Sequence, residues 1–122
     1  MDLYEQNILD HYRHPRNKGK MIKADASYHE INDTCGDEIF VSLEMMDNII
    51  KQIKFEGHGC AISQAAISIL SESLINKTKK EVMILKFKDL KEQFGIKVSE
   101  RRHKCALLGL WAIQHALEEY KK

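Results

Sequence analysis

The sequence predicts a small α+β domain, in which an antiparallel sheet of about three strands is flanked by helices. Its 122 residues are 43% hydrophobic, which is enough for one modest core, so we expect a single domain over residues 1–122. Apolar residues alternate with polar ones in the middle of the chain, and on both sides they recur every three to four residues. The first period is that of a half-buried strand and the second that of a helix.

The first helix and the hairpin follow from these periods. Pro15 should end an N-terminal helix, and residues 24–31 form a further strand candidate. Residues 39–45 and 49–55 read as two strands joined by a turn at Asp47-Asn48, which predicts an antiparallel hairpin. The apolar residues at helical spacing in the first segment are Leu3, Tyr4, Ile8, Leu9 and Tyr12.

The second half of the chain predicts helices only. Gly57-His58-Gly59 should break the hairpin, and an apolar helix should start at Cys60 and run to about Leu74. Thr78 with Glu81 forms a capping box for a short helix that reaches about Leu85. A further helical stretch should end at Gly95. Ser99 is the expected N-cap of a last helix that carries Cys105 in its second turn.

Composition excludes several classes of protein. Nineteen basic residues nearly balance eighteen acidic ones, so we expect no nucleic-acid partner. The apolar runs are interrupted well before about 20 residues, so no segment should span a membrane. The N-terminus lacks the basic start and apolar run of a signal peptide, and three cysteines cannot all pair within the chain. These features predict a cytoplasmic protein with free thiols.

Three cysteines and one aspartate are the candidate functional residues: Cys35, Asp37, Cys60 and Cys105. They lie in three segments that could supply three sulfur ligands and one oxygen ligand. Thiolates suit zinc, copper(I) and iron–sulfur clusters. Gly36 allows a turn in which Cys35 and Asp37 face one centre. Cys60 should lie in the first turn of its helix, where the helix dipole favours a thiolate.

Each candidate also has a simpler interpretation. A free cysteine is often a core residue, and for Cys105 taken alone this interpretation is as good as that of a ligand. Asp37 could cap its own turn through a side-chain hydrogen bond. Arg102 lies one helical turn before Cys105 and should support its thiolate. His103 projects roughly 200° around the helix from Cys105, so we do not expect it to be a ligand.

The other histidines carry weaker signals. The cluster around His11 and His14 could bind an anion, but a solvated helix end is the better interpretation. His58 is expected to be an exposed turn residue. The sequence indicates no partner for His29 or His115.

Four stretches carry a resemblance to a known family: Asp10-His-Tyr-Arg-His-Pro-Arg-Asn-Lys-Gly19, Thr34-Cys-Gly-Asp37, Phe55-Glu-Gly-His-Gly-Cys-Ala-Ile-Ser63 and Arg102-His-Lys-Cys-Ala106. In this order they resemble the NifU-like iron–sulfur cluster scaffold family over nearly the whole chain, with motifs most similar to those of SufU. The resemblance implies a SufE/NifU-like helix-flanked sheet. It also implies that Cys35, Asp37, Cys60 and Cys105 hold a zinc ion or a two-iron cluster, and that a pyridoxal-phosphate cysteine desulfurase supplies persulfide sulfur.

Two departures from the family pattern concern partners and subtype. Cys60 and Cys105 are 45 positions apart, which matches the shorter IscU pattern because SufU proteins carry an extra segment there. Lys104 stands where IscU has a histidine, and Ile96-Lys-Val-Ser-Glu-Arg-Arg replaces the Leu-Pro-Pro-Val-Lys chaperone motif. We therefore expect no chaperone docking of the IscU type.

Two functions remain open from the sequence. In the first, the protein is a scaffold: Cys35 accepts sulfur, and a [2Fe-2S] cluster forms on Cys35, Cys60 and Cys105. Asp37 is the fourth and weaker ligand, and the cluster is then transferred to apo-proteins. In the second, the protein is a zinc-dependent sulfurtransferase that passes only persulfide. A purely structural zinc domain is disfavoured, because such sites use four Cys or His ligands.

Overall fold

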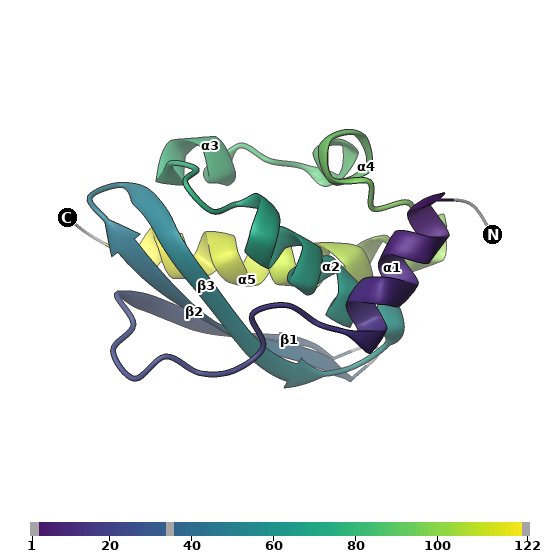
Figure 1. Cartoon of the computed structure of the whole chain (residues 1–122), viewed down its shortest axis with the longest axis horizontal. Helices are drawn as coiled ribbons and strands as arrows, with labels where there is room; N and C mark the ends of the chain where they lie inside the picture. Colours follow the sequence, from purple (N-terminus) through teal and green to yellow (C-terminus); the bar gives the residue numbers. More distant parts are fainter. Residues whose placement is uncertain (1–2, 34–35, 121–122) are drawn as a thin grey trace.

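The protein, as a computed structural model described over residues 3–33 and 36–120, contains one three-stranded antiparallel sheet and helices on one of its faces (Figure 1). The strands are β1 (Ala26–Asn32), β2 (Asp37–Met46) and β3 (Ile49–His58), and their order in the sheet is β1-β2-β3. This arrangement confirms the predicted α+β class and the number of strands.

The hairpin of β2 and β3 forms the centre of the fold. Asp47-Asn48 makes the turn, with Asp47 in the left-handed region at φ 56°. Side chains on β2 alternate as predicted, since Ile39, Val41 and Leu43 are fully buried whereas Phe40 is only half-buried. The buried side of the sheet is the side that the helices cover.

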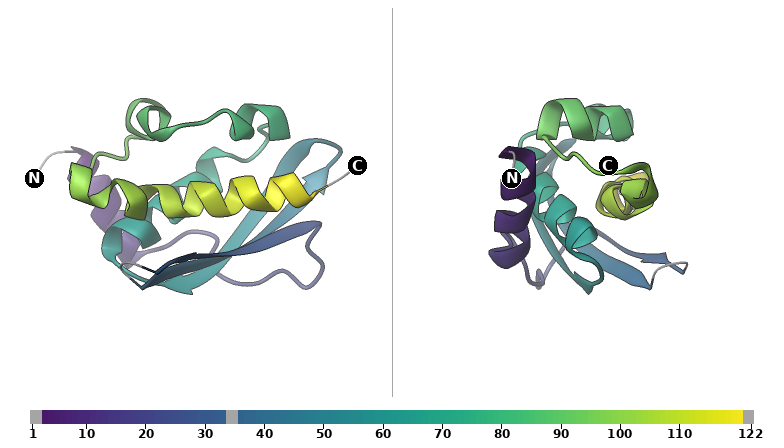
Figure 2. Two further views of the ribbon diagram at one scale, coloured as in Figure 1. Left: turned by 180° about the vertical axis from the view of Figure 1, so that it is seen from behind. Right: turned by 90° about the vertical axis from the view of Figure 1, so that its right-hand side faces the viewer.

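The helices form a layer above the sheet and a smaller group beyond it (Figure 2). Helix α2 packs on β3, α5 packs on β1 and β2, and α1 packs along α2. Helices α3 and α4 lie on the side of α2 and α5 that faces away from the sheet. Their bounds are α1 Leu3–Arg13, α2 Ala61–Ser73, α3 Lys79–Met83, α4 Phe87–Phe94 and α5 His103–Glu119.

Two helix boundaries follow the predicted local signals. Thr78 Oγ1 accepts a hydrogen bond from the Glu81 amide at 3.1 Å, and Glu81 Oε1 accepts one from the Thr78 amide at 2.9 Å, which completes the capping box. Gly95 ends α4 in the left-handed conformation, at φ 68°.

Three boundaries differ from the prediction. Ser99 precedes a single 3₁₀ turn (Glu100–Arg102), and α5 begins only at His103, so Cys105 lies in the first turn of that helix and not in the second. Cys60 is the N-cap of α2 and lies just outside its first turn. Strand β3 continues through Gly57, where a Cβ would lie 2.1 Å from the Glu38 carbonyl oxygen. Glycine therefore permits close strand pairing there, where the sequence suggested a break.

The solvated helix end predicted around His11 is wrong for His11 itself, which is only 6% exposed. Its Nδ1 lies 2.8 Å from Ser68 Oγ on α2, and the same hydroxyl oxygen accepts a hydrogen bond from the Arg16 amide at 2.9 Å. Burial lowers the pKa of His11 below its ordinary value of 6.5, and the nearby Arg16 charge adds to this effect.

We expect the stability of the protein to fall as the pH drops below about 6.5, because the unfolded chain then binds a proton at His11 that the folded protein resists. His11→Asn keeps an amide group near Ser68 and cannot titrate, so its melting temperature should depend less on pH between about 7 and 5. Thermal melts followed by circular dichroism at several pH values measure this difference. Parallel pH profiles for the two proteins would contradict the assignment, and His14→Ala, at an exposed position, is the control.

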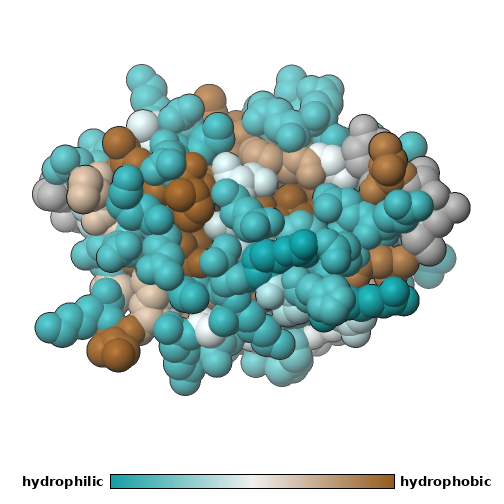
Figure 3. Space-filling model, viewed as in Figure 1, coloured by the Kyte–Doolittle hydropathy of each residue, from teal (hydrophilic) through white to brown (hydrophobic). Residues whose placement is uncertain are grey.

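Within residues 3–33 and 36–120, no helix has both the length and the apolar character needed to cross a bilayer. The face seen in Figure 3 is mostly hydrophilic, with hydrophobic residues visible in several separate places.

Candidate metal centre

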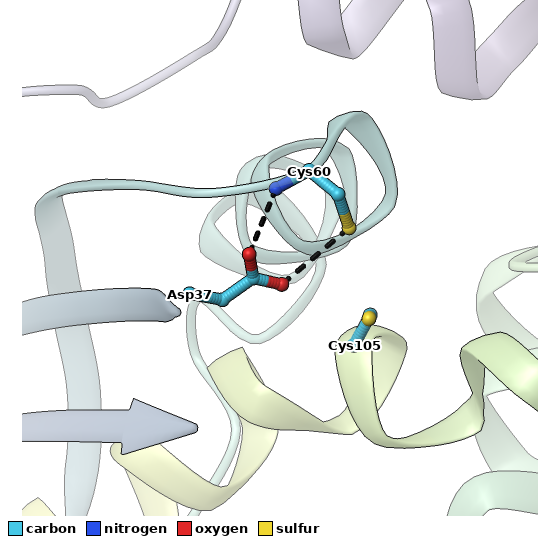
Figure 4. A group of neighbouring side chains, drawn as sticks. All are labelled: Asp37, Cys60 and Cys105. Atoms are coloured by element: carbon cyan, nitrogen blue, oxygen red, sulfur yellow. Dashed lines mark hydrogen bonds between the residues drawn. The ribbon is translucent and has the colours of Figure 1, made fainter. Parts of the chain in front are cut away.

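Asp37, Cys60 and Cys105 come together at one end of the sheet (Figure 4). A carboxylate oxygen of Asp37 and the two Sγ atoms all lie within 4.8 Å of one another. In the part of the chain that the structure describes, no other group of three His, Cys, Asp or Glu residues meets this spacing. Cys35, the fourth residue of the predicted set, lies outside the described residues.

The topology explains why these distant residues meet. Glu38 pairs with His58, so the start of β2 lies beside the end of β3, where the chain enters α2. Asp37 therefore faces the N-terminus of α2, which begins just after Cys60. Helix α5 packs across β1 and β2 and places its first turn, with Cys105, at the same end.

Asp37 is held by the N-terminal end of α2. Its Oδ1 accepts a hydrogen bond from the Cys60 backbone amide at 3.0 Å, and its Oδ2 lies 3.5 Å from Cys60 Sγ. The carboxylate is 2% exposed. It thus binds one of the amides that a helix N-terminus leaves without an internal partner, across 23 residues of sequence. The negative charge is also favourable at this end of the helix dipole.

The donor set fits a thiophilic metal ion. Ligand atoms around a tetrahedral zinc with Zn–S bonds of about 2.3 Å lie about 3.8 Å apart, so side-chain shifts of about 1 Å suffice here. Cys60 and Cys105 are not in disulfide bonds, so both keep their thiol groups. Because Oδ1 of Asp37 is bound to the Cys60 amide, its Oδ2 is the oxygen that faces the sulfur atom.

Gly59 keeps the carboxylate in place, since a Cβ at this position would lie 2.4 Å from Asp37 Oδ1. Gly59→Ala should therefore displace Asp37 and weaken zinc binding by at least about tenfold, which corresponds to about 1.4 kcal/mol. Competition with a chromogenic chelator measures the affinity. Gly19→Ala is the matched control, because Gly19 has a similar φ of 142° but no atom within 4 Å of an added Cβ. Equal affinities in the two variants would show that backbone strain alone causes the effect.

An apolar cavity of about 540 Å³ opens beside Cys60. Ile8 and Leu9 of α1 form one wall, and the segment from Lys97 to Arg102 forms another. Arg102 is exposed and lines the same cavity as Cys60, so the cavity beside this thiol carries a cation. The ring of His103 stacks on Phe87 of α4, with 3.8 Å between the ring centroids.

Besides His11, whose Nε2 lies 3.8 Å from Glu72 Oε1, three histidines have carboxylate partners that the sequence did not indicate. His115 on α5 contacts Glu30 on β1, and the two residues are 85 positions apart. His29 and His58, on β1 and β3, both approach the Glu38 carboxylate on β2. His58 is exposed as expected, but it lies at the end of a strand and not in a turn. These contacts depend on strand pairing and helix placement, so no local pattern reveals them.

The fold and the site together define a small α+β domain with an Asp/Cys/Cys group that could hold a metal ion. The family model for the NifU-like N terminal domain matches residues 3–122, and the chain belongs to this family.

Relatives and solved structures carry related names. The zinc-dependent sulfurtransferase SufU of Bacillus subtilis is 41% identical over 76 residues, which cover 62% of this chain and half the length of that protein. The iron–sulfur cluster assembly scaffold protein IscU 1 of Archaeoglobus fulgidus is 31% identical over 97% of this chain and 76% of its own. A crystal structure from Fervidobacterium islandicum AW-1, described as an assembly scaffold of the SUF system, has a TM-score of 0.75 and 30% identity. It covers 92% of this chain and 94% of its own.

Proposed function

We propose that this protein is a scaffold for iron–sulfur cluster assembly, which accepts sulfur from a cysteine desulfurase and transfers a [2Fe-2S] cluster to apo-proteins. The observation that carries this proposal is the convergence of Asp37, Cys60 and Cys105 within 4.8 Å. The resemblance to IscU-named relatives over 97% of the chain supports the same function. A cluster that must leave the protein needs a weaker ligand among its thiolates, and a carboxylate meets that need.

Cys35 is the proposed fourth ligand and the proposed sulfur acceptor. It stands two residues before Asp37 in the chain, next to Gly36, whose φ is 75°. In the proposed step the Cys35 thiolate attacks the outer sulfur of the desulfurase persulfide. The S–S bond of the donor breaks, the desulfurase thiolate leaves, and a new persulfide forms on Cys35. Reduction of this sulfur to sulfide then requires two electrons from an external donor.

Zinc fits the same residues in the isolated protein, where it would hold Cys35, Cys60 and Cys105 as thiolates. The protein's own contribution is the positioning of the ligands. The Cys60 amide fixes the Asp37 carboxylate through a hydrogen bond to Oδ1.

Arg102→Ala should slow sulfur acceptance from a desulfurase more than His103→Ala does. Arg102 lines the cavity beside Cys60 and can hold an anionic sulfur or carboxylate, whereas His103 stacks on Phe87. Arg101→Ala is the charge-matched control, because Arg101 is exposed and does not line that cavity. Persulfide transfer from a sulfur-labelled desulfurase measures the rate. An equal loss in the Arg102 and His103 variants would contradict the assignment.

Anaerobic assembly tests the function directly. The protein is incubated with a desulfurase, cysteine, ferrous iron and a thiol reductant, and its absorbance spectrum is recorded before and after addition of an apo-ferredoxin. A scaffold turns brown and passes its cluster to the ferredoxin. The 41% identity to SufU over part of the chain favours the zinc-dependent sulfurtransferase as the second candidate. A colourless protein that retains one zinc and still passes persulfide would establish that candidate and reject the scaffold.

A further inference from the structure

Cys60 and Cys105 are close enough to react with each other as well as to share a metal ion. Their Sγ atoms lie within 4.8 Å of each other, although the two residues are 45 positions apart in the chain. Figure 4 shows the two sulfur atoms facing each other, one at the start of α2 and the other in the first turn of α5. Two neighbouring thiols form a dithiol, which an oxidant converts to a disulfide.

The packing of α5 against α2 holds the two thiols near each other. Gly109 lies one helical turn after Cys105, and a Cβ at this position would lie 2.9 Å from Cβ of Ile67 on α2. Glycine therefore permits a close approach of the two helices at a buried contact. Because apolar core atoms make this contact, it does not require a metal ion to bring the sulfur atoms together.

The two thiols differ in their access to solvent. Cys60 is half-buried and lines the cavity of about 540 Å³, whereas Cys105 is 7% exposed. A small oxidant therefore reaches Cys60 before it reaches Cys105. Asp37 Oδ2 lies 3.5 Å from Cys60 Sγ and can accept the hydrogen of this thiol. Cys60 is thus placed to react with the oxidant, and Cys105 to close the disulfide.

The backbone around Cys60 leaves its side chain able to move. The sulfur atoms of a disulfide are closer than these two, so at least one side chain must rotate. Cys60 is the N-cap of α2, and no helical turn precedes it to restrict its rotamers. The bond from its backbone amide to Asp37 Oδ1 does not involve the side chain, so it can persist during this rotation.

We propose that Cys60 and Cys105 form a reversible disulfide in reaction with hydrogen peroxide, and that this bond switches the metal centre off. In the first step the Cys60 thiol attacks one peroxide oxygen, the O–O bond breaks, and a sulfenic acid and water form. In the second step the Cys105 sulfur attacks the Cys60 sulfur, the S–O bond breaks, and a second water leaves. The two thiols together lose two electrons, which reduce one hydrogen peroxide.

The disulfide changes the site in two ways. A metal binds the thiolate, so two of the four proposed ligands are lost when Cys60 and Cys105 are joined. The same bond protects Cys60 from further oxidation to the sulfinic and sulfonic acids, which thiols do not reduce. A dithiol reductant restores both ligands by thiol–disulfide exchange. The disulfide itself rests on the geometry of the two thiols, whereas its role in stopping cluster assembly rests on the proposed function.

Oxidation of the full chain by hydrogen peroxide tests the disulfide. The reduced protein is freed of metal by a chelator and treated with a small excess of hydrogen peroxide. We expect a monomeric product that has lost both thiols, with the peptides of Cys60 and Cys105 linked in a mass-spectrometric peptide map. Dithiothreitol should restore both thiols. A map that links Cys35 to either residue, or that contains no linked peptides, would overturn the proposed pair.

Serine variants separate the two roles. Cys35→Ser leaves both proposed partners in place and should form the disulfide as fast as the wild type does. On this background, Cys105→Ser should lose the Cys60 thiol at the same rate, but its product is a sulfinic acid that dithiothreitol does not reduce. Cys60→Ser on the same background should react at least about tenfold more slowly, because Cys105 is buried. Equal rates in the two double variants would contradict the assigned roles.

Metal binding and cluster assembly measure the regulatory role. Oxidised protein should take up no zinc from a chromogenic chelator, and after reduction it should bind about one zinc per chain. Zinc uptake with the disulfide intact would refute the switch. In anaerobic assembly with limiting thiol reductant, oxidised protein should show a lag that prior reduction removes, and equal time courses would refute the regulatory role. If reduced protein assembles no cluster, the scaffold function fails, and the peptide map still decides whether the disulfide forms.

Discussion

Removal of bound zinc should lower the melting temperature of this protein by at least about 10 °C, because the proposed ligands Asp37, Cys60 and Cys105 come from β2, from the N-cap of α2 and from α5, and a shared ion would join these elements. A metal ion that binds only the folded protein stabilises it by about 4 kcal/mol at a thousandfold excess over its dissociation constant. We expect about one zinc per chain after isolation in air, with Zn–S distances of about 2.3 Å. Calorimetry before and after chelation, with metal analysis, measures the change.

A variant without a complete ligand set provides the control. Cys105→Ser replaces a buried thiol by a similar but poorer ligand, so its melting temperature should respond much less to the chelator. An unchanged melting curve for the wild type after complete metal removal would show that the metal does not couple β2 to the two helices. X-ray absorption that shows fewer than three sulfur neighbours would contradict the proposed ligand set.

Replacement of Asp37 should slow the release of the cluster. Asp37→Cys supplies a stronger ligand for iron, and we expect the cluster lifetime to increase by about fivefold or more, equivalent to about 1 kcal/mol in the barrier. Transfer to an apo-ferredoxin should slow in parallel. Asp37→Ala should also lengthen the cluster lifetime if the cluster is released by exchange of the Asp37 carboxylate. The decay of cluster absorbance, with and without the acceptor, measures both quantities.

Asp37 also has a structural role, which a further variant separates from its proposed role as a ligand. Asp37 also accepts a hydrogen bond from the Cys60 amide, and loss of such a helix-capping interaction costs about 1 kcal/mol. Asp37→Asn keeps an oxygen for this amide while it removes the carboxylate charge, so it should be more stable than Asp37→Ala. If the Cys and Ala variants release their clusters as fast as the wild type does, Asp37 is not the point of exit.

Local signals were sufficient for most of the secondary structure. The capping box of Thr78 and Glu81, the stop at Gly95 and the turn at Asp47-Asn48 each depend on residues within a few positions of one another. The alternation along β2 predicted which side chains face the core. The sequence predicts these features because the same short-range interactions act in an isolated segment and in the folded protein.

The sequence by itself also determined the chemistry available to the site, because the side chains of Cys35, Asp37, Cys60 and Cys105 define its possible ligands. Their motif order placed the chain in its family, which the match over residues 3–122 confirms. The start of α5 was predicted too early, since Ser99 resembles an N-cap but begins only a 3₁₀ turn. Tertiary packing set the true start at His103.

Only the tertiary structure decided which distant groups meet. The Asp37 bond to the Cys60 amide spans 23 residues, and the His11 contact with Ser68 spans 57. The approach of His29 and His58 to Glu38 depends on the register of three strands. Such contacts arise when strand pairing and helix packing bury the shared apolar core. The residues that meet at the edges of that core are far apart in the sequence. Local spacing carries no information about such long-range contacts, so no sequence pattern predicts them.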